Sequence, residues 1–160
     1  MRVFNWLYEN LHKLVEAFIV LTVALMVLDV VVGVFARYVL NNAIHWVEEA
    51  SRYMMIWMAY LAMGMVIREE GNISVTFMVN WFPPAIRRII KVLGLLVIGF
   101  FLTVLFRESV KYMRILRIQT SPALGLPMIF PYMAVTVGAA LMFIDNLVLL
   151  FAYVTGKKPV

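Results

Sequence analysis

The chain has 160 residues, of which 64% are hydrophobic, and its mean hydropathy is +0.93. Because an average soluble domain is only about 45–50% apolar, this composition excludes an ordinary soluble protein and predicts an integral membrane protein. The net charge of +5 does not indicate binding to nucleic acid, since the basic residues mostly flank apolar segments, and the absence of cysteine excludes disulfides and thiolate metal sites.

Four segments are apolar and long enough to predict transmembrane helices, which need about 20 mainly apolar residues. We place them at residues 14–36, 47–67, 89–106 and 127–152 of a single membrane domain that covers residues 1–160. The first apolar run exceeds a signal-peptide core of about 7–15 residues, so we interpret it as a retained span. The predicted fold class is an all-α integral membrane protein with four transmembrane helices and amphipathic interfacial segments.

The segments between the spans are predicted to lie near the membrane interface. Between spans two and three, Gly71 can end a helix and Pro83 cannot continue one, which predicts a turn and a short interfacial segment. After span three, residues 107–120 carry basic side chains on one helical stripe and predict an amphipathic extension. Three prolines predict an irregular entry into the fourth span: Pro122, Pro127 and Pro131. Lysine and arginine are slightly more numerous on the side that holds both termini, which favours cytoplasmic termini.

A polar stretch at residues 37–60 interrupts the apolar sequence. On a helical wheel, Glu49 and Arg52 share one stripe with Glu48 beside it, and tryptophan and tyrosine form a second stripe. One interpretation is a helix end at the headgroup level, where Arg52 neutralises either glutamate in its own helix. The other interpretation is contact with a partner protein or with lipid headgroups. The residues assigned to this contact are Arg37, Trp46, Glu48, Glu49, Arg52, Tyr53 and Trp57.

Two aspartates lie inside predicted spans, where a charge is costly and therefore suggests a function. Asp29 shares a helix face with small residues, and Asp145 shares a face with Gly138 and has Asn146 beside it. We interpret both aspartates as buried, hydrogen-bonded contacts between helices. A site for a coupling ion or a proton remains the alternative for each.

The types and spacing of the polar residues predict neither catalysis nor a bound cofactor or metal. A zinc site needs three or four convergent ligands, but His12 and His45 are the only histidines and both lie at span edges. The same scarcity argues against haem. Because a Ser, His and Asp set is also missing, we predict that the chain is not an enzyme.

Several short motifs follow one another along the chain. They are Arg37-Tyr38-Val39, Trp46-Val47-Glu48-Glu49, Arg52-Tyr53, Trp57, Arg68, Ser121-Pro122-Ala123-Leu124-Gly125-Leu126-Pro127 and Pro131-Tyr132. In their order and spacing, the chain resembles the small membrane subunit of tripartite ATP-independent periplasmic (TRAP) transporters, the DctQ-like family. It departs from the family pattern at Asn72, where a histidine is expected, and at Ala62, where glycine is usual.

The resemblance implies that the chain is a scaffold for a larger permease subunit in the cytoplasmic membrane of a bacterium or archaeon. It also implies a periplasmic substrate-binding protein as a further partner, and sodium-driven uptake of a small organic acid. In that picture the larger subunit carries the substrate and sodium sites.

A rival interpretation is a self-sufficient four-helix exporter that couples transport to protons. It would work as a homodimer, with Glu16 or Asp29 as the proton carrier. The long amphipathic linkers argue against it, because so compact an exporter would not need them.

Overall fold

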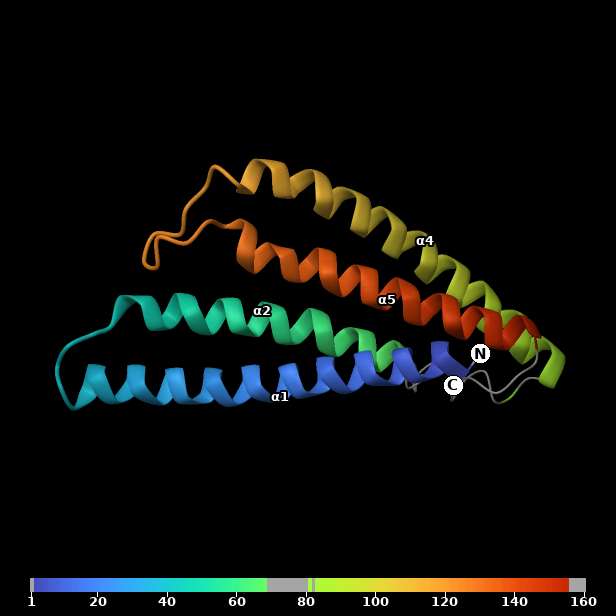
Figure 1. Cartoon of the computed structure of the whole chain (residues 1–160), viewed down its shortest axis with the longest axis horizontal. Helices are drawn as coiled ribbons and strands as arrows, with labels where there is room; N and C mark the ends of the chain where they lie inside the picture. The colour runs from blue at the N-terminus through green and yellow to red at the C-terminus, as the bar shows by residue number, and fades with distance from the viewer. Residues whose placement is uncertain (1, 69–80, 82, 156–160) are drawn as a thin grey trace.

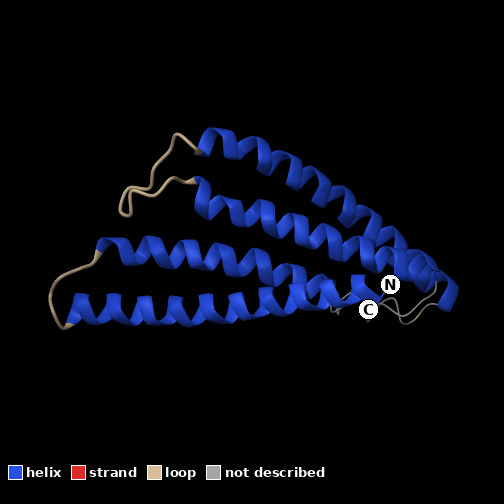
Figure 2. Cartoon of the chain, in the orientation of Figure 1, coloured by secondary structure: helices blue, strands red, loops and turns tan. Residues whose placement is uncertain are grey.

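The computed structural model describes residues 2–68, 81 and 83–155 and is helical over most of that length (Figures 1 and 2). Its helices are α1 (Arg2–Tyr38), α2 (His45–Arg68), α4 (Pro84–Leu116) and α5 (Ile129–Thr155). Each of the four is long and apolar enough to cross a membrane. The predicted all-α fold with four membrane-spanning helices is therefore confirmed.

The helix boundaries differ from the predicted spans mainly in α1 and α4. α1 begins at Arg2 instead of residue 14, because the polar residues before Lys13 include no proline or glycine that would stop a helix. α4 continues through residues 107–116, so the expected interfacial extension is the last part of this helix as far as Leu116. Most of the interfacial segment predicted between spans two and three falls outside the described residues.

The four helices lie side by side in a row, in the order α1, α2, α5, α4 (Figure 1). Among the described residues, the extensive contacts are those between α1 and α2, α2 and α5, and α5 and α4. α2 and α5 run in the same direction, whereas the other neighbours are antiparallel (Figure 1). This arrangement leaves many large apolar side chains exposed, among them Leu14 of α1 and Phe100 of α4.

α5 forms the centre of the fold, since it holds more of the buried residues than any other described helix. At Gly138 an added Cβ atom would come within 2.9 Å of the backbone oxygen of Tyr60 in α2, so only glycine permits this approach. On the other side of α5, Asn146 donates a hydrogen bond of 3.1 Å to the backbone oxygen of Leu95 in α4. Small residues and a polar side chain thus hold α5 to both neighbours, as is typical of helices packed in a membrane.

Candidate functional site

The first polar cluster, which we call the hairpin end, lies where α1 ends and α2 begins. Arg37 of α1 forms an ion pair with Glu48 of α2, and both side chains are exposed. This pairing differs from the predicted one, in which Arg52 neutralises Glu48 or Glu49 within α2. Arg52 and Trp46 are exposed at the same end, and Trp57 is half-buried against Phe18 of α1, with ring centroids 6.1 Å apart.

Glu49 lies beside Glu48 but is buried and faces the interior of the chain. Its Oε2 atom accepts hydrogen bonds from the backbone N–H groups of Ala123 (2.8 Å) and Leu124 (3.0 Å). The Tyr53 hydroxyl donates to its Oε1 atom and also contacts the Met128 sulfur at 3.4 Å. One carboxylate therefore fixes the loop before α5 to the start of α2.

The loop at residues 117–128 has a defined backbone. Ser121 donates its N–H to the oxygen of Leu126 at 2.8 Å, and Gly125 donates to the oxygen of Ser121 at 3.1 Å. Gly125 has a φ of +66°, in the left-handed region that favours glycine. The irregular entry predicted from the prolines is thus a compact turn held by backbone hydrogen bonds and by Glu49.

Asp29 of α1 lies in the contact with α2, on the side of the hairpin end. The Ser51 hydroxyl of α2 donates a hydrogen bond of 2.7 Å to its Oδ2 atom, and the Asp29 side chain is half-buried. This bond gives the carboxylate a partner across the helix pair. Sequence reasoning did not identify Ser51.

The second polar cluster, which we call the buried cluster, surrounds Asp145 of α5. The Tyr8 hydroxyl of α1 donates a hydrogen bond of 2.6 Å to Asp145 Oδ1, and His12 Nε2 lies 3.0 Å from the same oxygen. All three side chains are buried. His12 Nδ1 lies 2.9 Å from the backbone oxygen of Tyr8, so each ring nitrogen has an oxygen atom beside it.

α2 also contributes to the buried cluster. The Arg68 guanidinium lies over the Tyr8 ring, 5.3 Å from its centroid, and Gly64 of α2 lies beside Asp145 Oδ2. That oxygen has no hydrogen-bond partner among the described residues. The cluster thus joins α1, α2 and α5 near the end where α1 begins and α5 ends (Figure 1).

Sequence reasoning identified Asp145 but missed Tyr8 and His12. Both fell outside the predicted first span, which began at residue 14. The available signal was their spacing of four residues, which places them on one face of a helix extended toward the N-terminus.

Residues 26–155 match the family described as "Tripartite ATP-independent periplasmic transporters, DctQ component". The chain belongs to this family. The resemblance inferred from the sequence is thereby confirmed, and the four apolar helices make this DctQ component a multi-pass membrane protein. The match includes Glu49, Asp145 and the loop at residues 117–128, whereas Tyr8 and His12 precede it.

Curated relatives agree with the family. This DctQ component is 37% identical over 81 residues to a TRAP transporter small permease protein of Haemophilus influenzae, covering 51% of this chain and 50% of that protein. It is 29% identical over 146 residues to the isethionate TRAP transporter permease protein DctMQ of Oleidesulfovibrio alaskensis, covering 88% of this chain. The chain spans about half the length of the first relative and 23% of the second.

Proposed function

We propose that the chain is the scaffold subunit of a TRAP transporter and packs against a larger permease subunit in the bacterial or archaeal cytoplasmic membrane. The observation that carries this proposal is the match of residues 26–155 to the DctQ component family, and the row of helices leaves large apolar side chains exposed to lipid or to another protein. In membranes, association between helices depends on packing and hydrogen bonds, and such a row offers a long surface to another protein.

A relative supports the existence of the larger partner. The DctMQ protein of Oleidesulfovibrio alaskensis is a single chain in which the segment similar to ours makes up only 23% of the length. In DctMQ, the segment similar to our chain and the rest of the protein belong to one polypeptide, which favours contact between them. We propose that the remainder of that protein corresponds to the larger subunit that our chain binds as a separate protein.

The continuity of the helices favours a scaffold role for the chain over a role in forming the transport pathway. Transporter cores usually contain helices that are broken near the membrane midplane and expose backbone groups to substrate and ions. The four described helices are continuous, and Asp29 and Asp145 both bond with side chains of neighbouring helices. We therefore propose that the larger subunit carries out sodium-driven uptake of a small organic acid, which a periplasmic binding protein delivers.

The positions of the helix ends also bear on the orientation of the chain in the membrane. α1 begins and α5 ends at the same end of the row, and the hairpin end lies at the other (Figure 1). With both termini in the cytoplasm, as the basic residues favour, the hairpin end faces the periplasm. The exposed residues Arg37, Trp46, Glu48 and Arg52 then lie where they can contact headgroups, the permease or the binding protein.

Co-purification tests the scaffold function. A tagged chain extracted from native membranes in mild detergent should retain a larger, many-spanning permease subunit in a constant ratio. An untagged strain is the control for non-specific capture. Recovery of the chain alone, together with proton-coupled transport in liposomes that contain only this chain, would favour the exporter and overturn the proposal.

The Asp29→Asn variant tests whether Asp29 is a packing contact between α1 and α2. Asparagine retains a side-chain oxygen that accepts the hydrogen bond from Ser51, so we expect uptake to stay within about twofold of the wild type. The matched variant Ser51→Ala removes the donor and should lower stability by about 0.6 kcal/mol, a typical value for such bonds in membranes. Loss of ion dependence in assembled Asp29→Asn complexes would instead indicate a coupling role.

A further inference from the structure

α4 lies at one edge of the row (Figure 1), and its outer side, away from α5, changes from apolar to basic along the helix. The first part of this side exposes Leu93, Leu96 and Phe100. Arg107 and Arg114 follow Phe100 at intervals of seven residues, which return to nearly the same helical face, and both are exposed. Because basic residues are typical of the ends of membrane spans, the outer side of α4 leaves the hydrocarbon close to Arg107.

The last turns of α4 stand farther from the membrane than Arg107. The helix continues to Leu116, and Arg117 keeps helical dihedral angles (φ −62°, ψ −29°). Each helical residue adds about 1.5 Å, so Arg114 lies about 10 Å and Arg117 about 15 Å beyond Arg107 along the axis. A typical tilt of about 20° reduces these heights by only about 6%. The headgroup layer on each side of a bilayer is about 5–8 Å thick, so the end of α4 stands beyond it, in water.

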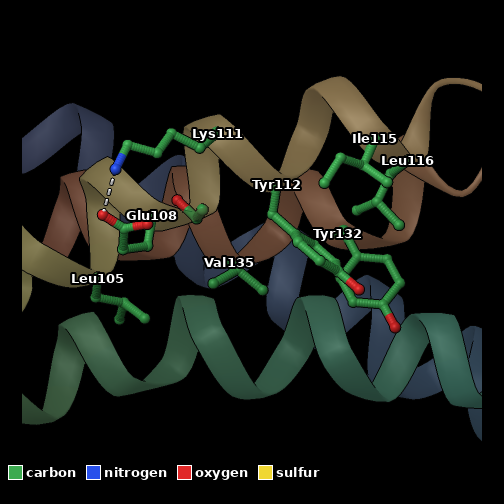
Figure 3. A pocket seen from close by; sticks show the side chains of 9 residues that line it. Leu105, Glu108, Lys111, Tyr112, Ile115, Leu116, Tyr132 and Val135 are labelled. Carbon is green, nitrogen blue, oxygen red and sulfur yellow. Dashed lines mark hydrogen bonds and ion pairs between the residues drawn. The ribbon is translucent and has the colours of Figure 1, made fainter.

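This end of α4 carries an unbalanced positive charge. The segment 107–128 contains four basic residues and one acidic residue, Glu108. Glu108 accepts a hydrogen bond of 2.7 Å from Lys111, and both side chains line a groove between α4 and α5 (Figure 3), so these two charges are already matched. Arg114 and Arg117 are exposed, and neither has an ion-pair partner among the described residues. Their guanidinium groups are therefore available to an acidic partner.

An exposed apolar residue follows the two arginines. Ile118 is 87% exposed, the largest value among the big apolar side chains of the described residues. Its position is fixed, because its N–H bonds to the oxygen of Ile115 at 3.4 Å and the next residue accepts a hydrogen bond of 2.9 Å from Met128. Interfaces between proteins commonly place apolar residues at the centre and polar residues around them, and arginine is enriched there. We call Arg114, Arg117 and Ile118 the α4 tip.

We propose that the α4 tip docks an acidic surface of the periplasmic substrate-binding protein. This inference rests on the proposed function, which supplies the partner and the orientation: the α4 tip lies at the same end of the row as the hairpin end (Figure 1). A soluble protein reaches side chains that stand beyond the headgroups, whereas lipid does not. Complementary charge mainly speeds diffusional encounter, which matters more for a partner that binds and leaves in each transport cycle than for a permanent subunit.

Association kinetics test the proposal. The complex co-purified from native membranes is held in phosphatidylcholine nanodiscs, and the binding protein of the same transporter is the soluble probe. At about 0.15 M salt, where the Debye length is about 8 Å, we expect Arg114→Glu and Arg117→Glu each to slow association about fivefold. At about 1 M salt the Debye length falls to about 3 Å, so the difference from the wild type should largely disappear. Arg107→Glu is the matched control on the same helical face, and should change the rate by less than about twofold, because it lies more than a Debye length below the tip.

The other outcomes separate this inference from the proposed function. Equal association rates in the wild type and all three variants, with the permease still bound, would overturn the inference and leave the scaffold role intact. Loss of the permease from Arg114→Glu or Arg117→Glu complexes would show that the α4 tip contacts the permease, which also contradicts docking of the binding protein there. A wild-type chain that purifies without any permease would overturn the proposed function, and this inference with it.

A cysteine at the α4 tip reports the contact directly. The chain contains no cysteine, so Ile118→Cys introduces a unique thiol. In spheroplasts a membrane-impermeant maleimide should label this thiol from outside, and added binding protein should slow the labelling at least about fivefold. Phe100→Cys, on the apolar part of the same side of α4, should stay unlabelled. Labelling of Ile118→Cys only after permeabilisation, or at a rate that the binding protein leaves unchanged, would show that the tip is not the docking surface.

Discussion

Replacing Asp145 with alanine should lower the stability of the purified chain by about 2–4 kcal/mol. The change removes the shared acceptor of the Tyr8 hydroxyl and of His12, and each buried donor left without a partner costs about 1–3 kcal/mol. Thermal unfolding in detergent measures the loss. Asp145→Asn keeps an acceptor of similar size and should cost less.

The neighbouring residue supplies a control for this prediction. Ile144 is exposed on α5, so Ile144→Ala tests the effect of truncating a side chain there without disturbing the buried cluster. A double-mutant cycle of Asp145→Ala with Tyr8→Phe should give an interaction energy of about 0.5–3 kcal/mol, as is usual for residues in direct contact. If Asp145→Ala were as stable as Ile144→Ala, the cluster would not hold α1 to α5.

The buried cluster also shows where sequence reasoning reaches its limit. Hydropathy located all four helices, because a membrane span must be apolar over about 20 residues. It placed the start of the first helix at residue 14, because the polar residues before it, His12 among them, lower the local hydropathy. Tyr8 and His12 of that polar turn are buried against Asp145, more than 130 residues later in the sequence.

The hairpin end shows a second limit. A helical wheel compares residues only within one helix, so it suggested Arg52 as the partner of Glu48. The structure instead pairs Glu48 with Arg37 across the turn between α1 and α2. The order α1, α2, α5, α4 was equally out of reach, because surfaces that face lipid and surfaces that face protein are both apolar in a membrane.

The contact between Glu49 and the loop before α5 leads to the second large expected effect. Glu49→Ala should release the loop, because the N–H groups of Ala123 and Leu124 lose their carboxylate acceptor. Hydrogen bonds to a charged group contribute about 1.5–3 kcal/mol each, and the loop loses two of them. Amide hydrogen exchange at these two residues should rise by at least about tenfold, because 1.4 kcal/mol already corresponds to that factor.

Three variants determine which part of Glu49 matters. Glu49→Gln retains an oxygen acceptor but loses the charge, and should give intermediate exchange at the loop amides. Tyr53→Phe removes only the hydroxyl that orients the carboxylate, and should have a smaller effect. Glu48→Ala breaks the exposed pair with Arg37 and should leave hydrogen exchange at the loop amides unchanged, because exposed ion pairs contribute only about 0–1 kcal/mol.

Equal exchange in Glu48→Ala and Glu49→Ala would mean that the loop keeps its conformation without the Glu49 carboxylate, and that its backbone hydrogen bonds and Gly125 are sufficient. A selective rise in Glu49→Ala, with uptake reduced and co-purification unchanged, would instead indicate that the ordered loop takes part in docking at this end of the chain.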